Sequence, residues 1–320
     1  MQTPSIFSAA ALCASVCLGN ASLGSAQPMT RGDASPIALD SGARVEFHAV
    51  QSEALGRAVD FSIYFPASYA TTERNYPVIY FLHGLNNDHS SWTVTRHGNL
   101  PQLLDELMGN GTIPETIVVH PDGDRSFYTN YKSGGMGYED WVVHELPAHI
   151  EKTYRASTSR NGRAIAGTSM GGYGALKIAM RFPQRYRAVA AHSAIVMPLR
   201  NPFDVPEQVK MSRRYQYFSQ MFQQIYGDPF DQEYYDQNNP LVLSETNDLD
   251  GLAIYFDYGT ADRYDSQIRI GLGLKKLATQ LEARGYSPVF HAYPNEPHGW
   301  ALVVDHIAES FGFIAEKMSP

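Results

Sequence analysis

The sequence predicts an α/β fold with a mostly parallel central sheet, helices on both faces and an antiparallel edge at the N-terminal side. Three observations support this prediction: strand-like and helix-like segments alternate from residue 77 onward, several strand-like runs are apolar throughout, and two earlier runs follow each other as a hairpin does. Continuous apolar strands are typical of parallel sheets that helices cover on both sides.

The first two strand-like segments are residues 45–50 (VEFHAV) and 57–66 (RAVDFSIYFP), which are rich in β-branched and aromatic residues. A short polar stretch with a glycine separates them, so we expect an antiparallel pair at the sheet edge. Residues 77–84 (PVIYFLHG) form a nearly continuous apolar run that ends in glycine. This pattern indicates a strand buried on both faces.

From there strands and helices alternate. We expect strands at 116–123, 163–167 and 186–194 and helices at 140–155 and 170–181. At the C-terminal end the pattern predicts a strand at 252–259 (LAIYFDYG), an amphipathic helix that ends before Gly285, a strand at 287–294 (SPVFHAYP) and a final helix after Pro297.

Residues 199–250 interrupt this alternation with an irregular mixture rich in Pro, Asn, Gln and Tyr. We interpret them as an insertion that is either a lid or a rigid surface feature. The chain has 320 residues, is 43% hydrophobic and 18% charged, and contains no linker-like stretch in its middle. We therefore expect residues 27–320 to form one domain with this insertion.

The first 26 residues are expected to be a cleaved signal peptide, which would place the protein in the periplasm or outside the cell. An apolar run from Ile6 to Leu18 is followed by small residues up to Ala26, although no basic residue occurs before Arg31. The alternative is a disordered N-terminal tail. The apolar run is too short for a stable membrane span.

Composition excludes several classes of function. Both cysteines, Cys13 and Cys17, lie in the N-terminal segment, so the mature chain would lack cysteine catalysis, zinc–thiolate sites and iron–sulfur clusters. The formal net charge is −8 and the basic residues are scattered, which argues against nucleic acid or an anionic membrane as a partner. We expect a substrate that is neutral or recognised locally.

The segment GTSMGGYGA contains the pattern G-x-S-x-G at Gly167, Ser169 and Gly171. Between a strand and a helix, this pattern predicts a nucleophilic serine on a sharp turn, where only glycines allow neighbouring backbone to approach. The alternative is a glycine-rich connection without chemistry. The upstream LHGL segment supplies a loop after a strand, so the backbone N–H groups of Leu85 and Met170 are candidates for an oxyanion hole.

A serine nucleophile needs a base, and the base needs an orienting acid. Asp262 lies in the loop after the strand at 252–259, whereas Asp257 lies within that strand and Asp265 is placed to cap the next helix. His298 lies in the loop EPHGW before the final helix. The order Ser169, Asp262, His298 is therefore the predicted triad. We assign structural or supporting roles to the histidines His83, His120, His144 and His192.

Taken together, the ordered motifs resemble the esterase D-type branch of the α/β-hydrolases over roughly residues 45–316. The motifs are PVIYFLHGLNNDHSSW, PDGDRSFYTN, EDWVVHELPAHIEKTY, AIAGTSMGGYGALKIAMRFPQRY, FDYGTADRYD and PHGW. This branch includes tributyrin-type short-chain esterases, S-formylglutathione hydrolases, feruloyl and acetyl-xylan esterases, and mycolyltransferases. The resemblance implies a triad at Ser169, Asp262 and His298 without a metal or cofactor.

The expected function is that of an exported serine carboxylesterase acting on short-chain, acetyl-type or feruloyl esters of a small molecule or carbohydrate. The alternatives are an acyltransferase of the mycolyltransferase type, a thioesterase similar to S-formylglutathione hydrolase, and a binding protein without catalysis. Trp92, Tyr128 and Trp300 flank the motifs and are candidates for the substrate pocket, with ordinary core packing as the alternative.

Overall fold

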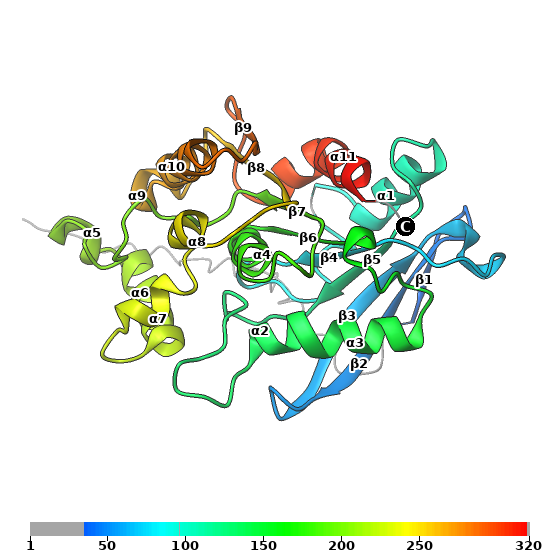
Figure 1. Ribbon diagram of the computed structural model, residues 1–320, viewed down its shortest axis with the longest axis horizontal. Helices are drawn as coiled ribbons and strands as arrows, with labels where there is room; N and C mark the ends of the chain where they lie inside the picture. The colour runs from blue at the N-terminus through cyan, green and yellow to red at the C-terminus, as the bar shows by residue number, and fades with distance from the viewer. Residues whose placement is uncertain (1–34, 96, 319–320) are drawn as a thin grey trace, which may run out of the picture. The chain divides into compact units, whose positions relative to one another are not determined.

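The centre of the molecule is a nine-stranded sheet, seen in the computed structural model, which describes residues 35–95 and 97–318 (Figure 1). The strands are β1 (Ile37–Ala38), β2 (Arg44–Ser52), β3 (Arg57–Phe65), β4 (Val78–Leu82), β5 (Ile117–Pro121), β6 (Arg163–Thr168), β7 (Ala188–His192), β8 (Ala253–Gly259) and β9 (Val289–Tyr293). Their order in space is β1-β2-β3-β5-β4-β6-β7-β8-β9.

The sheet is antiparallel at one edge and parallel elsewhere. β1, β2, β3 and β5 pair antiparallel in that order, and the remaining neighbours from β5 through β4 to β9 are parallel. Every residue of β4, β5, β6 and β7 is buried, as the continuous apolar runs predicted. The predicted fold class is confirmed.

Register brings the ends of three parallel strands to the same edge of the sheet. Leu82 at the end of β4 pairs with Gly167 of β6, and Gly167 pairs with Ala191 of β7. From β4 the chain leaves toward β5 on one side and later returns to β6 on the other. The loops after β4 and β6 therefore diverge at a topological switch point, where open α/β sheets form their sites.

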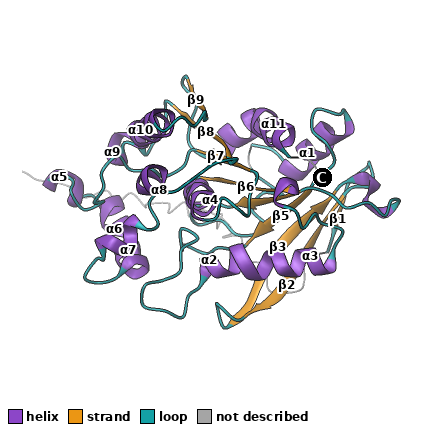
Figure 2. Ribbon diagram, viewed as in Figure 1, coloured by secondary structure: helices purple, strands orange, loops and turns teal. Residues whose placement is uncertain are grey.

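Helices cover both faces of the sheet (Figure 2). They are α1 (Leu100–Gly109), α2 (Tyr138–Asp140), α3 (Leu146–Thr153), α4 (Met170–Arg181), α5 (Glu207–Lys210), α6 (Arg213–Tyr226), α7 (Gln232–Asp236), α8 (Pro240–Thr246), α9 (Asp265–Ile268), α10 (Ile270–Ala283) and α11 (Trp300–Lys317). Short 3₁₀ turns lie at Ala67–Ala70 and Arg160–Gly162.

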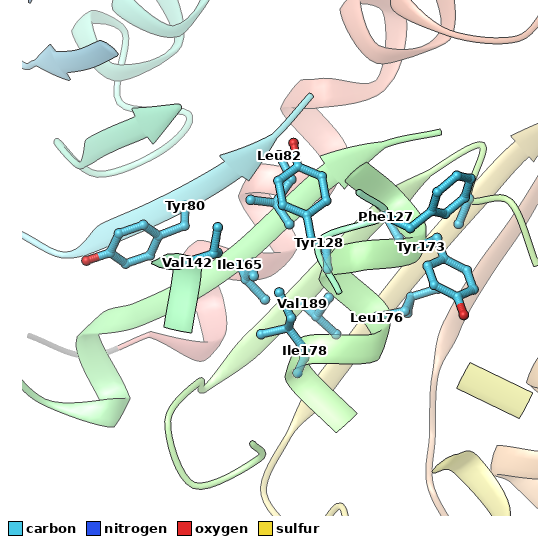
Figure 3. Close-up of a cluster of buried hydrophobic side chains, with 14 of the residues drawn as sticks. Tyr80, Leu82, Phe127, Tyr128, Val142, Ile165, Tyr173, Leu176, Ile178 and Val189 are labelled. Atoms are coloured by element: carbon cyan, nitrogen blue, oxygen red, sulfur yellow. The ribbon is translucent and has the colours of Figure 1, made fainter. Parts of the chain in front are cut away.

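Two hydrophobic clusters correspond to the two faces. Helices α1 and α11 contribute to one cluster, and α3, α4, α6, α8 and α10 contribute to the other. Figure 3 shows part of the second cluster, in which Leu176 and Ile178 of α4 lie beside Ile165 of β6 and Val189 of β7. All residues of α4 except Arg181 are buried, so this helix is held rigidly behind the loop that precedes it.

The helix expected at 140–155 is a continuous helical run from Tyr138 to Thr153. A π-helical turn at Trp141–Glu145 joins α2 to α3, and Pro147 stands in the first turn of α3. Proline has no N–H to donate, and the π turn before it, in which the N–H of Leu146 donates to the carbonyl of Trp141, accommodates it within the run.

The insertion at 199–250 is more regular than expected, because it forms helices α5 to α8. Its aromatic residues Phe218, Phe222, Tyr226 and Tyr235 are buried in the second cluster. The insertion is thus an integral part of the folded core rather than an irregular excursion.

All described residues fall in one compact unit. The expected signal peptide at residues 1–26 lies outside the described residues. Within the described part of the chain, no helix combines the length and the apolar character needed to cross a bilayer.

Candidate active site

Ser169 stands alone between β6 and α4, on a turn with φ 58° and ψ −116°. Residues other than glycine rarely adopt this backbone conformation, so its presence at a serine indicates a functional constraint. The neighbouring glycines allow the turn. A Cβ at Gly167 would lie 2.5 Å from the carbonyl carbon of Gly171, and a Cβ at Gly171 would lie 2.5 Å from that of Leu82. The turn is therefore packed against the end of β4.

The structure brings the three predicted triad side chains into one hydrogen-bonded chain. Nε2 of His298 lies 2.8 Å from Oγ of Ser169, and Nδ1 of His298 lies 2.5 Å from Oδ2 of Asp262. Because the carboxylate can only accept, Nδ1–H donates to it and the lone pair of Nε2 accepts the serine hydroxyl. This tautomer leaves His298 ready to take the proton of Ser169.

The aspartate is fixed and shielded from water. Its side chain is fully buried, and its second oxygen accepts the backbone N–H of Tyr264 at 2.8 Å. The ring of Tyr264 meets the imidazole of His298 edge-on, with centroids 4.6 Å apart. Burial in low dielectric strengthens the contact between carboxylate and imidazole.

Leu85 and Met170 lie on the two loops that converge at Ser169. Met170 is the first residue of α4, so its N–H is one of those that a helix leaves unpaired. Leu85 follows Gly84, where an added Cβ would lie 3.4 Å from Cβ of Ser169. Among the described residues, neither N–H donates to a backbone carbonyl. Both are free to bind an oxygen.

His83 sets the direction of the Leu85 N–H, which makes specific the structural or supporting role assigned to it from the sequence. This fully buried histidine donates from Nδ1 to the carbonyl of Gly84 at 2.9 Å and accepts the N–H of Gly123 at Nε2, also at 2.9 Å. The carbonyl of Gly84 and the N–H of Leu85 belong to one trans peptide and point in opposite directions. The hydrogen bond that fixes the carbonyl of Gly84 therefore also fixes the direction of the Leu85 N–H. In the sequence, the feature that indicated this role was the position of His83 directly before the loop glycine, Gly84.

A pocket of about 430 Å³ opens over the serine. Ser169, His298 and Trp300 line it, together with the loop residues Asn86 and Asn87. The expectation that Trp300 flanks a pocket agrees with its position at the start of α11. The lining is rich in amides, hydroxyls and backbone groups, which suits a substrate with polar groups.

Trp92 and Tyr128, the other two candidates for the pocket, are core residues. Trp92 is fully buried, stacks on His120 and donates its indole N–H to Ser62 at 2.8 Å. Tyr128 is also fully buried, and its hydroxyl donates to the carbonyl of His83 at 3.2 Å. Neither side chain reaches the pocket, so the alternative of core packing holds for both.

A buried ion pair ties α4 to α2. Nζ of Lys177 lies 2.6 Å from a carboxylate oxygen of Glu139 and 3.2 Å from the hydroxyl of Thr129. Burial lowers the pKa of Lys177 to about 8, and the nearby carboxylate of Glu139 offsets only part of this effect. Lys177 thus holds the helix behind Ser169 in place.

A second chain of aspartate, histidine and serine lies inside the protein. His192 contacts Oδ2 of Asp257 through Nδ1 at 2.8 Å and Oγ of Ser310 through Nε2 at 3.0 Å. All three residues are fully buried, and Ser310 donates to the carbonyl of Ile307. No substrate can reach this serine, so the arrangement joins β7, β8 and α11 structurally.

The described residues contain no group of three or more His, Cys, Asp or Glu side chains arranged to hold a metal ion.

Comparison with known proteins matches residues 52–309 to the Esterase family model, described as "Putative esterase". An esterase of Mycobacterium tuberculosis is 32% identical over 154 residues, which are 47% of this chain and 32% of that protein. An S-formylglutathione hydrolase of Paracoccus denitrificans is 25% identical over 283 residues, covering 84% of this chain and 91% of the relative.

The fold is also found among solved structures. A ferulic acid esterase superposes with a TM-score of 0.69 at 22% identity, covering 86% of this chain and 99% of that structure. The chain spans about a third of the length of the first curated relatives that it matches.

Proposed function

Because this chain belongs to the Esterase family and has the esterase D-type α/β-hydrolase fold, we propose that it is a serine carboxylesterase. Its substrates in this proposal are esters of short, acetyl-type acyl groups or of ferulate. The observation that carries the proposal is the hydrogen-bonded chain from Asp262 through His298 to Ser169 at the floor of a polar pocket. We further propose that residues 1–26 direct export to the periplasm or the medium, which N-terminal sequencing of the secreted protein tests.

The first half of the reaction forms an acyl-enzyme. Oγ of Ser169 attacks the ester carbonyl while Nε2 of His298 takes its proton, and Asp262 stabilises the resulting imidazolium. The carbonyl oxygen becomes an oxyanion, which accepts hydrogen bonds from the N–H groups of Leu85 and Met170. When the tetrahedral intermediate collapses, Nε2 returns the proton to the departing alkoxide and the alcohol leaves.

The second half releases the acid. Nε2 of His298 removes a proton from water, and the hydroxide attacks the acyl carbonyl through the same oxyanion hole. Collapse returns the proton to Oγ of Ser169, so the enzyme is regenerated. Attack by a sugar or polyol hydroxyl in place of water would make the protein an acyltransferase, and a thioester substrate would make it a thioesterase. Both share the same acyl-enzyme.

The test uses p-nitrophenyl esters from acetate to decanoate together with methyl ferulate. We expect the wild-type protein to hydrolyse the short esters or the ferulate and Ser169→Ala to lower kcat by about 10⁴-fold or more. Ser310→Ala is the matched control, because it removes the serine of the buried chain that no substrate reaches. Transfer product exceeding free acid when a polyol is added would favour the acyltransferase. Equal activity of wild type and Ser169→Ala would overturn the proposal.

A further inference from the structure

Arg263 introduces a positive charge into the pocket directly beside the proposed triad. It follows Asp262 in the loop after β8, is exposed, and lines the same pocket as Ser169 and His298. We propose that this pocket selects esters that carry a carboxylate and that Arg263 binds that carboxylate. The inference rests on the proposed esterase function and names its substrate class.

Arg263 has no acidic partner in the described part of the chain. No Asp or Glu oxygen there lies within the 4.0 Å that defines an ion pair with its guanidinium. The neighbouring carboxylate of Asp262 is buried and occupied by His298 and the backbone of Tyr264. The guanidinium instead lies over the ring of Tyr264, 5.0 Å from its centroid. Its hydrogen-bond donors therefore remain available for a ligand.

The remainder of the pocket favours negative charge as well. None of the described residues that line it is an aspartate or glutamate, and Arg263 is the one lysine or arginine among them. This contrasts with the net charge of −8 of the whole chain. A pocket without carboxylates in an acidic protein is a local reversal of charge, and such reversals attract a ligand of the opposite sign.

The N-terminus of α11 adds to this field. Gly299 and Trp300, where α11 begins, line the pocket, and no side chain caps the first turn of this 18-residue helix. The unpaired N–H groups and the positive end of the helix dipole face the same space as Arg263. In the proposed reaction the oxyanion binds at the N-terminus of α4, but it leaves the N-terminus of α11 and the guanidinium of Arg263 without a negatively charged partner. A carboxylate on the substrate could bind to both of these groups.

The experiment compares matched esters that differ only in a carboxylate. For the acyl side the pair is the mono-p-nitrophenyl ester of adipate and p-nitrophenyl hexanoate. For the alcohol side the pair is 4-acetoxybenzoate and 4-acetoxybenzamide. The quantity measured is the ratio of kcat/KM for the charged ester to that for the neutral one. The pair with the higher ratio identifies which side of the substrate carries the charge.

Three variants separate the role of Arg263 from general charge effects. We expect Arg263→Gln to lower the ratio for the preferred pair by about 10-fold or more, as for loss of a charged hydrogen bond, and Arg263→Lys to lower it less. Lys275→Gln removes one positive charge from the exposed face of α10 and should leave the ratio unchanged. Raising the salt concentration should reduce the wild-type ratio, because Arg263 is exposed and screened.

Binding provides a readout that does not need turnover. Calorimetry with the Ser169→Ala protein measures the affinity for the two charged esters and for their neutral partners, with and without Arg263→Gln. Preferential binding of a charged ester that depends on Arg263 supports the inference. If neutral esters are hydrolysed but neither the ratio nor the affinity depends on Arg263, the inference is overturned and the esterase proposal stands. If no ester is hydrolysed, the esterase proposal fails and the calorimetry alone decides on the carboxylate site.

Discussion

Replacement of Gly171 by alanine should damage both the fold and the chemistry. The added Cβ would lie 2.5 Å from the carbonyl carbon of Leu82 and 2.7 Å from the carbonyl oxygen of His83, whereas ordinary contacts begin near 3.4 Å. Both neighbours are backbone atoms of a buried strand and its loop, so no rotamer change relieves the contact. The start of α4 and the end of β4 must therefore separate by about 1 Å.

We estimate the cost of this separation from comparable overpacking. Overpacking of this kind destabilises by about 3 kcal/mol, which corresponds to a Tm lowered by about 5 °C in a chain of this size. The same shift moves the N–H of Met170 away from that of Leu85, and a misplacement of about 1 Å costs on the order of 100-fold in rate. Differential scanning calorimetry and kcat on p-nitrophenyl acetate measure the two effects.

Gly312→Ala provides the matched control. Gly312 lies inside α11, where an added Cβ meets no atom within 4 Å. Alanine should stabilise the helix by about 0.5–1 kcal/mol and leave kcat unchanged. If Gly171→Ala had the Tm and kcat of wild type, the close approach of α4 to β4 could not be what positions the two N–H groups.

Two further predictions concern residues around the turn. His83→Leu removes the donor to the carbonyl of Gly84 and should lower kcat by about 10–100-fold with little change in KM. His83→Asn keeps a donor near the position of Nδ1 and should recover part of the lost kcat. Equal kcat for the two variants would refute the positioning role. Lys177 has a pKa of about 8 in the folded protein against a usual value of 10.5, so the unfolded chain binds its proton more tightly. As pH rises from 8 to 10.5, the wild type should therefore gain about 3 kcal/mol of unfolding free energy relative to Lys177→Met. Urea titrations across this range measure the difference, and a constant difference would contradict the lowered pKa of Lys177.

The elements that the sequence predicted well are those with a simple pattern. The apolar runs bounded by glycine or proline became β4, β5 and β6 within two residues at each end, and the helix after Ser169 has the predicted bounds. The three triad candidates could be chosen from the sequence because each follows a strand or precedes a helix at the same sheet edge. Topology alone then brings them together.

Other elements were missed because capping residues resemble loop residues. The insertion appeared irregular, yet Ser212, Asp231 and Asn239 cap the helices α6, α7 and α8 with their side chains. In the same way, α1 escaped prediction although Asn99 caps it and Pro101 stands in its first turn. The amino-acid composition of such segments does not show whether a Ser, Asp or Asn caps a helix or lies in a turn.

Side-chain direction was the part of the site that the sequence could not supply. Tyr128 lies within the motif PDGDRSFYTN, but its backbone has φ 53° and its ring lies inward, where it fills the space beside Gly123 and Gly174. The contact of His83 with Gly123 depends on a loop about forty residues away in the chain. Such long-range contacts leave no periodic signal in a single sequence.

The burial of α6 has a consequence for access to the proposed site. This helix lies beside the loops of Asn86 and Tyr264, through contacts from Tyr217 and Phe218. Swinging it outward would expose five buried side chains at about 1.5–3 kcal/mol each, or about 8–15 kcal/mol together, so an open form would be rarer than roughly one molecule in 10⁵. The buried side chains are Phe218, Met221, Phe222, Ile225 and Tyr226. The proposed site is thus preformed on this side, and a substrate would reach it without an outward movement of α6.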